Sequence, residues 1–222
     1  MARHICASIL AADQGRLAEE AQRMEKAGAD FIHVDVMDGK FVPPVHYGVE
    51  TVRKLANQVR IGIEAHLMVQ RPWESVGEYA KAGAQRIIYH RETGNEKEME
   101  KTASIISKSN SVAGIAINPA TPVERLSREM LEGNGIILVM SVNPGWAGQD
   151  FIAESPEKVA QVSSLLGNYG LEREIEMDGG INAHTAKQCA LAGAHSFVAG
   201  SYLFKSKDAE KSIGQLRALM EK

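Results

Sequence analysis

The chain has 222 residues, of which 44% are hydrophobic, 24% charged and 5% aromatic, a composition typical of a soluble globular protein. Its formal net charge of −3 gives no general attraction to nucleic acid or to an anionic membrane, so an anionic ligand has to be held by local geometry. The N-terminus has no apolar signal-peptide core, and no apolar run approaches the ~18 residues that a membrane span needs. We therefore expect a cytoplasmic protein without a membrane segment, in which Cys6 and Cys189 are reduced thiols.

Eight short apolar runs alternate with helical patterns along the chain. Strands are predicted over His4–Ile9, Phe31–Val36, Ile61–Leu67, Arg86–Tyr89, Val112–Ile117, Gly135–Met140, Arg173–Met177 and Ser196–Ala199. Apolar residues three and four positions apart predict helices between them, for example over Gln14–Ala27, Pro72–Ala82 and Pro156–Tyr169, the last capped by Ser155.

Three Ala-Gly-Ala segments, at residues 27–29, 82–84 and 192–194, each end a helical pattern just before a strand. Glycine at such a joint can take the left-handed conformation that closes a helix. Eight β–α units in 222 residues predict a single (β/α)8 TIM barrel domain over residues 1–222, near the compact limit of that fold. A doubly wound open sheet is the alternative that periodicity does not exclude, although no Gly-x-Gly-x-x-Gly follows the first strand.

Polar side chains stand at the ends of several predicted strands. His33 and Asp35 are two residues apart and share one strand face; taken alone, that pair favours a structural hydrogen bond. His66 ends the third strand, Asp178 follows the seventh and Ser8 lies near the end of the first, where the active groups of a barrel gather. Two imidazoles and two carboxylates predict one divalent cation, zinc before iron(II), manganese or cobalt.

Methionines accompany these polar groups, because Met37, Met68 and Met140 fall at or just past strand ends. Methionine often only fills a core, and that interpretation is as good as a functional one. In the functional interpretation, the three side chains form an uncharged, polarizable wall of a substrate pocket.

Glycine-rich turns follow the last three predicted strands. They comprise Asn143–Gly148 with Gly145 and Gly148, Asp178–Gly180 with Gly179 and Gly180, and Gly200-Ser201. Backbone amides in such turns can converge on an anion, and barrels often bind phosphate with the loops after strands seven and eight. The turns predict a phosphate site that needs neither lysine nor arginine.

Six segments in order along the chain closely resemble the signature of the ribulose-phosphate 3-epimerase family. They are Ser8–Leu10, His33–Pro43, His66–Met68, Asn118–Pro122, Val139–Gly145 and Met177–Asn182, and the resemblance extends from about residue 5 to residue 204.

The resemblance implies a metal-dependent (β/α)8 barrel that interconverts D-ribulose 5-phosphate and D-xylulose 5-phosphate in the pentose phosphate pathway. By this resemblance His33, Asp35, His66 and Asp178 hold the metal, and the two aspartates are the acid and base that pass through a 2,3-enediolate. Substrate contacts are expected from Ser8, His66, Met37, Met68, Met140, Gly145, Gly148, Gly179, Gly180, Gly200 and Ser201. The resemblance also suggests a homo-oligomer, either a dimer or a hexamer.

The chain departs from the family pattern around the expected pocket. Pro44-Val45-His46, Trp146-Ala147 and Tyr202-Leu203-Phe204 replace the usual residues, and Ala7 replaces a proline, which leaves the identity of the sugar phosphate open. The role of Cys6 is also open, although a small buried hydrophobe is the simpler interpretation.

Other functions stay open at this point. D-allulose 6-phosphate is the alternative epimerase substrate, and a sugar-phosphate sensor without catalysis is a further alternative. A decarboxylase of the orotidine-phosphate type is disfavoured, because Asp-x-Lys-x-x-Asp is absent and Met37 stands two residues after Asp35.

Overall fold

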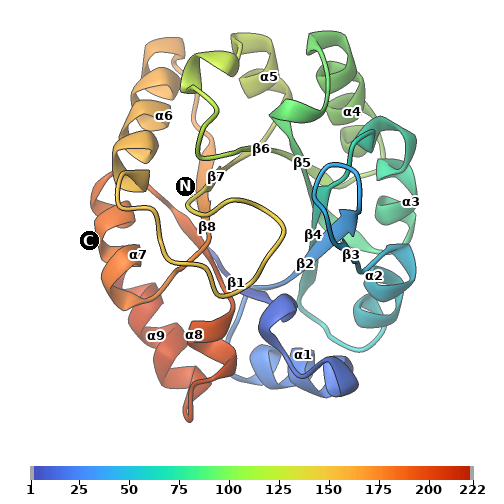
Figure 1. Cartoon of the computed structure of the whole chain (residues 1–222), viewed down its shortest axis with the longest axis vertical. Coiled ribbons are helices and arrows are strands. Elements are labelled where there is room, and N and C mark those ends of the chain that lie inside the picture. The colour runs from blue at the N-terminus through green and yellow to red at the C-terminus, as the bar shows by residue number, and fades with distance from the viewer. Residues whose placement is uncertain (1–2, 221–222) are drawn as a thin grey trace.

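The computed structural model describes residues 3–220, which form a ring of parallel strands surrounded by helices (Figure 1). The strand order is β1-β9-β8-β7-β6-β5-β4-β2, and β1 also pairs with β2, which closes the ring. This closure confirms the predicted (β/α)8 barrel and excludes the open doubly wound sheet.

The strands are β1 (Ile5–Ser8), β2 (Phe31–Asp38), β3 (Val45–His46), β4 (Gly62–Met68), β5 (Ala84–His90), β6 (Val112–Ile117), β7 (Ile136–Met140), β8 (Glu174–Asp178) and β9 (Ser196–Ala199). The helices are α1 (Leu17–Lys26), α2 (Val49–Ala56), α3 (Val76–Lys81), α4 (Glu96–Lys108), α5 (Arg128–Gly133), α6 (Ser155–Tyr169), α7 (Ala183–Leu191), α8 (Ser201–Phe204) and α9 (Ala209–Met220).

Successive side chains of each strand point alternately to the core between strands and helices and to the interior of the barrel. On β2, Ile32 and Val34 belong to the main hydrophobic core, which also takes in buried residues of the surrounding helices. His33 and Asp35 lie on the other face of the same strand, inside the barrel. Because both faces are buried, the strands read in the sequence as nearly continuous apolar runs.

All eight predicted strands occur, with boundaries that differ by a few residues. The glycines of the three Ala-Gly-Ala joints have φ values of +94°, +104° and +112°, which confirms their predicted positive-φ conformation. Ser155 is not the predicted cap, because it is the first residue of α6 and Glu154 occupies the cap position. Within residues 3–220, no helix is both long and apolar enough to cross a membrane.

One strand was not expected. Val45 and His46 pair antiparallel with Asp38 and Met37, which makes β3 a two-residue hairpin partner of β2 beside the barrel mouth. This pairing fixes the loop that begins at Gly39, whose amide donates to the Pro44 carbonyl at 2.9 Å.

Candidate active site

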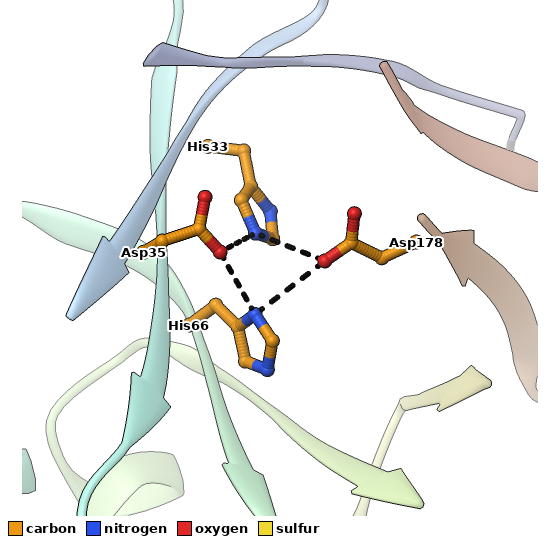
Figure 2. Close-up of side chains that lie close together, drawn as sticks. All are labelled: His33, Asp35, His66 and Asp178. Carbon is orange, nitrogen blue, oxygen red and sulfur yellow. Dashed lines mark hydrogen bonds and ion pairs between the residues drawn. The ribbon is translucent and has the colours of Figure 1, made fainter. Parts of the chain in front are cut away.

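Four side chains from three strands meet at one end of the barrel interior (Figure 2). His33 and Asp35 come from β2, His66 from β4 and Asp178 from the last position of β8. Asp35 and His66 are register partners in adjacent strands, which brings their side chains together. The sequence prediction that these four residues converge is therefore supported by their placement.

Each imidazole contacts both carboxylates. His33 Nε2 lies 3.1 Å from Asp35 Oδ1 and 3.8 Å from Asp178 Oδ2. His66 Nδ1 lies 3.2 Å from the same Asp35 oxygen and 3.7 Å from the same Asp178 oxygen. The four atoms thus form a closed ring of alternating nitrogen and oxygen donors, as the dashed lines in Figure 2 trace.

Burial and nearby charges shift the pKa values of the two aspartate carboxyl groups in opposite directions. Burial alone would raise the pKa of Asp35, but His33 and His66 lower it well below its ordinary value. Burial, reinforced by the charges of Asp35 and Glu64, raises the pKa of Asp178 to about 7. The two aspartates therefore have opposite tendencies to hold a proton, as the acid and base of one site often do.

The donor set fits a divalent cation. The ligand atoms of His33, Asp35, His66 and Asp178 all lie within 4.8 Å of one another. Two imidazole nitrogens and two carboxylate oxygens match the ligands that zinc and neighbouring transition metals take. Two carboxylates this close in a buried site also repel each other unless a positive charge lies between them.

Two buried residues behind His33, Glu64 and Arg86, orient its imidazole ring. His33 Nδ1 lies 2.7 Å from Glu64 Oε1, so that Nε2 is left facing the carboxylates. Glu64 Oε2 is in turn 3.0 Å from Nε of the buried Arg86. Sequence analysis missed this pair, because one acidic residue within an apolar strand has no pattern that distinguishes it.

Cys6, Glu64 and Glu176 also lie close enough together to suggest a cation site. Arg86 already supplies a positive charge there, because its Nε is 3.0 Å from Glu64 Oε2 and its Nη1 and Nη2 are each 3.8 Å from Cys6 Sγ and Glu176 Oε2, respectively. Cys6 is fully buried and its thiol donates to Glu176 Oε1 at 3.1 Å. Burial, with the charges of Glu176 and Glu64, raises the pKa of Cys6 well above its ordinary value.

A cavity of about 490 Å³ opens above the four-residue cluster. Its wall contains both aspartates and these predicted substrate residues: Ser8, Met37, Met68, Met140, Gly145, Gly148, Gly179, Gly180, Gly200 and Ser201. His66, also predicted to contact substrate, is fully buried and does not line this cavity. Of the departures noted in the sequence, Trp146, Ala147 and Tyr202 line the wall, and Trp146 is 62% exposed.

The glycine turns bring three loops together at the cavity. Gly180 has φ +60°, and a Cβ at this position would come within 2.9 Å of the Phe151 amide nitrogen. Phe151 follows the glycine-rich segment between β7 and α6, which lies across the ring of strands in Figure 1. The close approach of these two backbones is therefore only open to glycine.

The wall also holds one cation that was not predicted. Lys205 follows α8 and lies among the cavity-lining residues with Gly200 and Ser201. The sequence analysis did not single out Lys205, because the glycine-rich turns were enough to predict a phosphate site without a lysine.

Comparison with known proteins identifies the family of the chain. Residues 4–204 match the Ribulose-phosphate 3 epimerase family. The chain is 38% identical to the ribulose-phosphate 3-epimerase of Synechocystis sp., over 96% of this chain and 92% of that protein. It is 37% identical to the enzyme of the same name from Escherichia coli (strain K12), over 98% of this chain and 96% of that protein. A chloroplastic ribulose-5-phosphate-3-epimerase of Arabidopsis thaliana is 36% identical, over 95% of this chain and 75% of that protein.

The chain is thus an epimerase, an enzyme of the isomerase class. It belongs to the ribulose-phosphate 3-epimerase family, whose substrates are phosphorylated sugars.

Two solved structures with the same barrel are more distant in sequence than these relatives. KGPDC from Streptococcus mutans superposes with a TM-score of 0.74 at 13% identity, covering 100% of this chain and 98% of that chain. Orotidine 5'-phosphate decarboxylase from Pyrococcus horikoshii gives a TM-score of 0.66 at 15% identity, covering 98% of this chain and 99% of that chain. At this identity the likeness concerns the fold alone.

Proposed function

We propose that the protein interconverts D-ribulose 5-phosphate and D-xylulose 5-phosphate by inverting carbon 3. One observation carries the proposal: two carboxylates from different strands, Asp35 of β2 and Asp178 of β8, meet at the floor of a sugar-sized cavity. The names of the relatives give the substrate class.

Epimerisation beside a carbonyl needs a base on one face of the carbon and an acid on the other. Asp35 removes the C3 proton in one direction, and Asp178 returns a proton from the opposite face to the 2,3-enediolate. In the reverse direction the two carboxyl groups exchange roles. Because they belong to different strands, they can lie on opposite faces of a bound sugar.

Neighbouring residues hold the carboxylates for this task. Ser8 Oγ donates to Asp35 Oδ2 at 2.8 Å, which leaves Oδ1 turned to the two histidines. His33, Asp35, His66 and Asp178 would hold the cation, which supplies Lewis-acid stabilisation of the negative charge that develops at the C2 and C3 oxygens.

The cavity wall provides the other functions. Met37, Met68 and Met140 are almost fully buried at its base and exclude water from the reacting carbon. The turns with Gly145, Gly148, Gly179, Gly180, Gly200 and Ser201 bind the phosphate through backbone amides and the Ser201 hydroxyl. Fixing the phosphate places C3 between Asp35 and Asp178, and such positioning lowers the activation barrier by several kcal/mol.

Several finer assignments complete the proposal. Zinc is the expected cation, because two imidazoles and two carboxylates suit it, with iron(II), manganese and cobalt as alternatives. We place the enzyme in the cytoplasm and in the pentose phosphate pathway, as a homodimer or homohexamer. These assignments are supported by the family and by the substrate that the relatives are named for.

The test is an assay of the purified protein with D-ribulose 5-phosphate and D-allulose 6-phosphate, with each of the four metals added to chelated protein. We expect turnover of the pentulose phosphate to exceed that of the hexulose phosphate and to depend on added metal. Faster turnover of D-allulose 6-phosphate would replace the substrate in the proposal. Binding of both without turnover or C3 proton exchange would identify a sugar-phosphate sensor instead.

A further inference from the structure

His66 is the first member of a buried chain of contacts that leads away from the site. His66 Nε2 lies 2.8 Å from His90 Nε2, and the two rings stack with centroids 5.0 Å apart. His90 Nδ1 lies 3.2 Å from Glu92 Oε2. Both histidines are fully buried, so water does not compete for these nitrogens.

The donor and acceptor directions in these contacts follow from the carboxylate at the far end. Glu92 is a carboxylate whose pKa is lowered to about 2, because the hydrogen bonds that it accepts from His90, Thr121 and the Asn118 amide outweigh its burial. An ionised carboxylate only accepts hydrogen bonds, so His90 has to present Nδ1–H to it. His90 Nε2 is then a bare acceptor, and it can only be satisfied by Nε2–H of His66.

This direction decides which nitrogen of His66 is free. With the proton on Nε2, the Nδ1 lone pair faces Asp35 Oδ1 at 3.2 Å and Asp178 Oδ2 at 3.7 Å. In the opposite tautomer His66 would donate to Asp35, and the bare Nδ1 of His90 would face the Glu92 carboxylate. Asp35 and Glu92 therefore compete for the tautomer of His66. Asp35 Oδ1 has a second imidazole partner, His33 Nε2 at 3.1 Å, so Asp35 can give up the proton of His66 more easily than Glu92 can give up that of His90. The metal-free protein should already favour Nε2–H on His66, and a bound cation adds to this preference.

We propose that His90 and Glu92 are positioning residues that keep a proton on His66 Nε2 and so leave Nδ1 free for the cation. The inference rests on the proposed metal site and adds a positioning pair to it. His33 is positioned in the same way but without an intervening histidine, because its Nδ1 contacts Glu64 directly and its Nε2 faces the site. The two histidines thus present different ring nitrogens, and each has an acceptor behind it.

The far end of the chain of contacts is itself well anchored. Glu92 Oε1 accepts from the Asn118 amide at 2.8 Å and from the Thr121 hydroxyl, both in the loop after β6. Lys158 of α6 donates to the carbonyls of Asn118 and Pro119 at 2.6 and 2.9 Å and holds that loop. Glu92 therefore has a fixed oxygen to offer to His90.

The first experiment reads the tautomers directly, in metal-free protein whose histidines carry ¹⁵N, by two-bond nitrogen–proton correlation. In the wild type, His66 Nε2 should be protonated. In Glu92→Gln, whose amide can donate to His90 Nδ1, the proton of His66 should move to Nδ1. A bare Nε2 on His66 in the wild type, or no change in Glu92→Gln, overturns the proposal.

The second experiment measures zinc affinity by competition with a chelator. Loss of an outer hydrogen-bond partner of a metal-bound histidine typically costs roughly 10–100-fold in affinity. We expect this loss in Glu92→Gln and in His90→Leu, and recovery in His90→Gln, whose amide can accept from His66 and donate to Glu92. Glu124→Gln, an exposed acid in the same loop after β6, is the control that should bind zinc like the wild type.

The outcomes separate the two proposals. If the wild type does not turn over either sugar phosphate, the proposed function is wrong, and if it turns over without binding zinc or needing a metal, the proposed metal role is wrong; in both cases the His66 tautomer still tests the positioning pair. If the wild type needs zinc and all four variants bind it equally tightly, the positioning pair is wrong. Thermal unfolding of each metal-free variant identifies any loss that comes from misfolding, and His90→Gln then carries the test.

Discussion

The four donor residues differ in what surrounds them, and their predicted roles differ accordingly. Asp35 is held by Ser8 and by two histidines, whereas Asp178 ends its strand and borders the cavity through a less crowded carboxyl group. At the scale of single residues, therefore, substitutions at Asp178 give the clearest test of the two-carboxylate mechanism.

Asp178→Asn should lower kcat/KM by roughly 10²–10⁴-fold, the usual contribution of a general acid or base. The variant keeps an oxygen donor but has no carboxylate to carry a proton. The measurement is the epimerase rate together with C3 proton exchange in D2O, from each of the two epimers. An unchanged rate and exchange from both epimers would refute the mechanism.

Lys205 gives a second prediction at this scale. It lies at the wall near Gly200 and Ser201, at a place where an ammonium group would attract a phosphate. Lys205→Gln should raise KM about threefold to tenfold with kcat almost unchanged, and the difference should shrink at high salt. The control is Lys207→Gln, because Lys207 does not line the cavity. Equal KM values for both variants would remove Lys205 from the site.

Cys6 and Cys189 are both fully buried, and burial raises the pKa of the Cys189 thiol to about 12. The native protein should therefore not react with iodoacetamide at pH 8, whereas two thiols per chain should react after unfolding. Mass spectrometry counts the added groups. Modification of Cys6 in the native protein would show that the interior opens near the site.

At the scale of elements, the eight strands of the barrel could be predicted from the sequence, but the short strand β3 could not. Parallel strands buried on both faces leave apolar runs, and the barrel follows from eight of them. The two residues of β3 leave no such pattern, since Pro43 and Pro44 precede them and Val45 is 78% exposed.

The candidate site shows the same division. His33, Asp35, His66 and Asp178 stand out in the sequence because polar groups at strand ends interrupt apolar runs. Glu64, His90 and Glu92 matter only through their partners, which come from other strands and loops. Contacts of that kind depend on three-dimensional packing, so they have no recognisable spacing in the sequence.

The turn after β8 gives an element-scale prediction. Gly180→Ala places a Cβ 2.9 Å from the Phe151 amide nitrogen at φ +60°, so it should destabilise the fold by about 2 kcal/mol and weaken phosphate binding. Gly167→Ala in α6 meets no atom within 4 Å and should instead stabilise the fold by about 0.5–1 kcal/mol. Urea unfolding of both variants measures the difference, and equal changes would contradict the argument.

At the scale of the whole molecule, the cation site links three strands of the ring. A ligand that binds only the folded state stabilises it, by about 2.7 kcal/mol at a hundredfold excess over Kd. For a chain of this size, that corresponds to a rise in Tm of roughly 5–10 °C. We expect this rise when zinc is added to chelated wild-type protein, and a smaller one in His66→Asn. Equal melting temperatures with and without zinc in the wild type would contradict the proposed site.

The closure of the ring by β1 and β9 also determines when the site can exist. A chain that is still being synthesised carries His33, Asp35 and His66 early, but Asp178 and the closing strand β9 come only near its end. Until both have left the ribosome, a cation finds three donors on an open sheet rather than four inside a barrel. The complete donor set therefore exists only once β8 and β9 have been synthesised, and a truncated product that ends before β8 should bind zinc more weakly than the whole 222-residue chain in competition with a chelator.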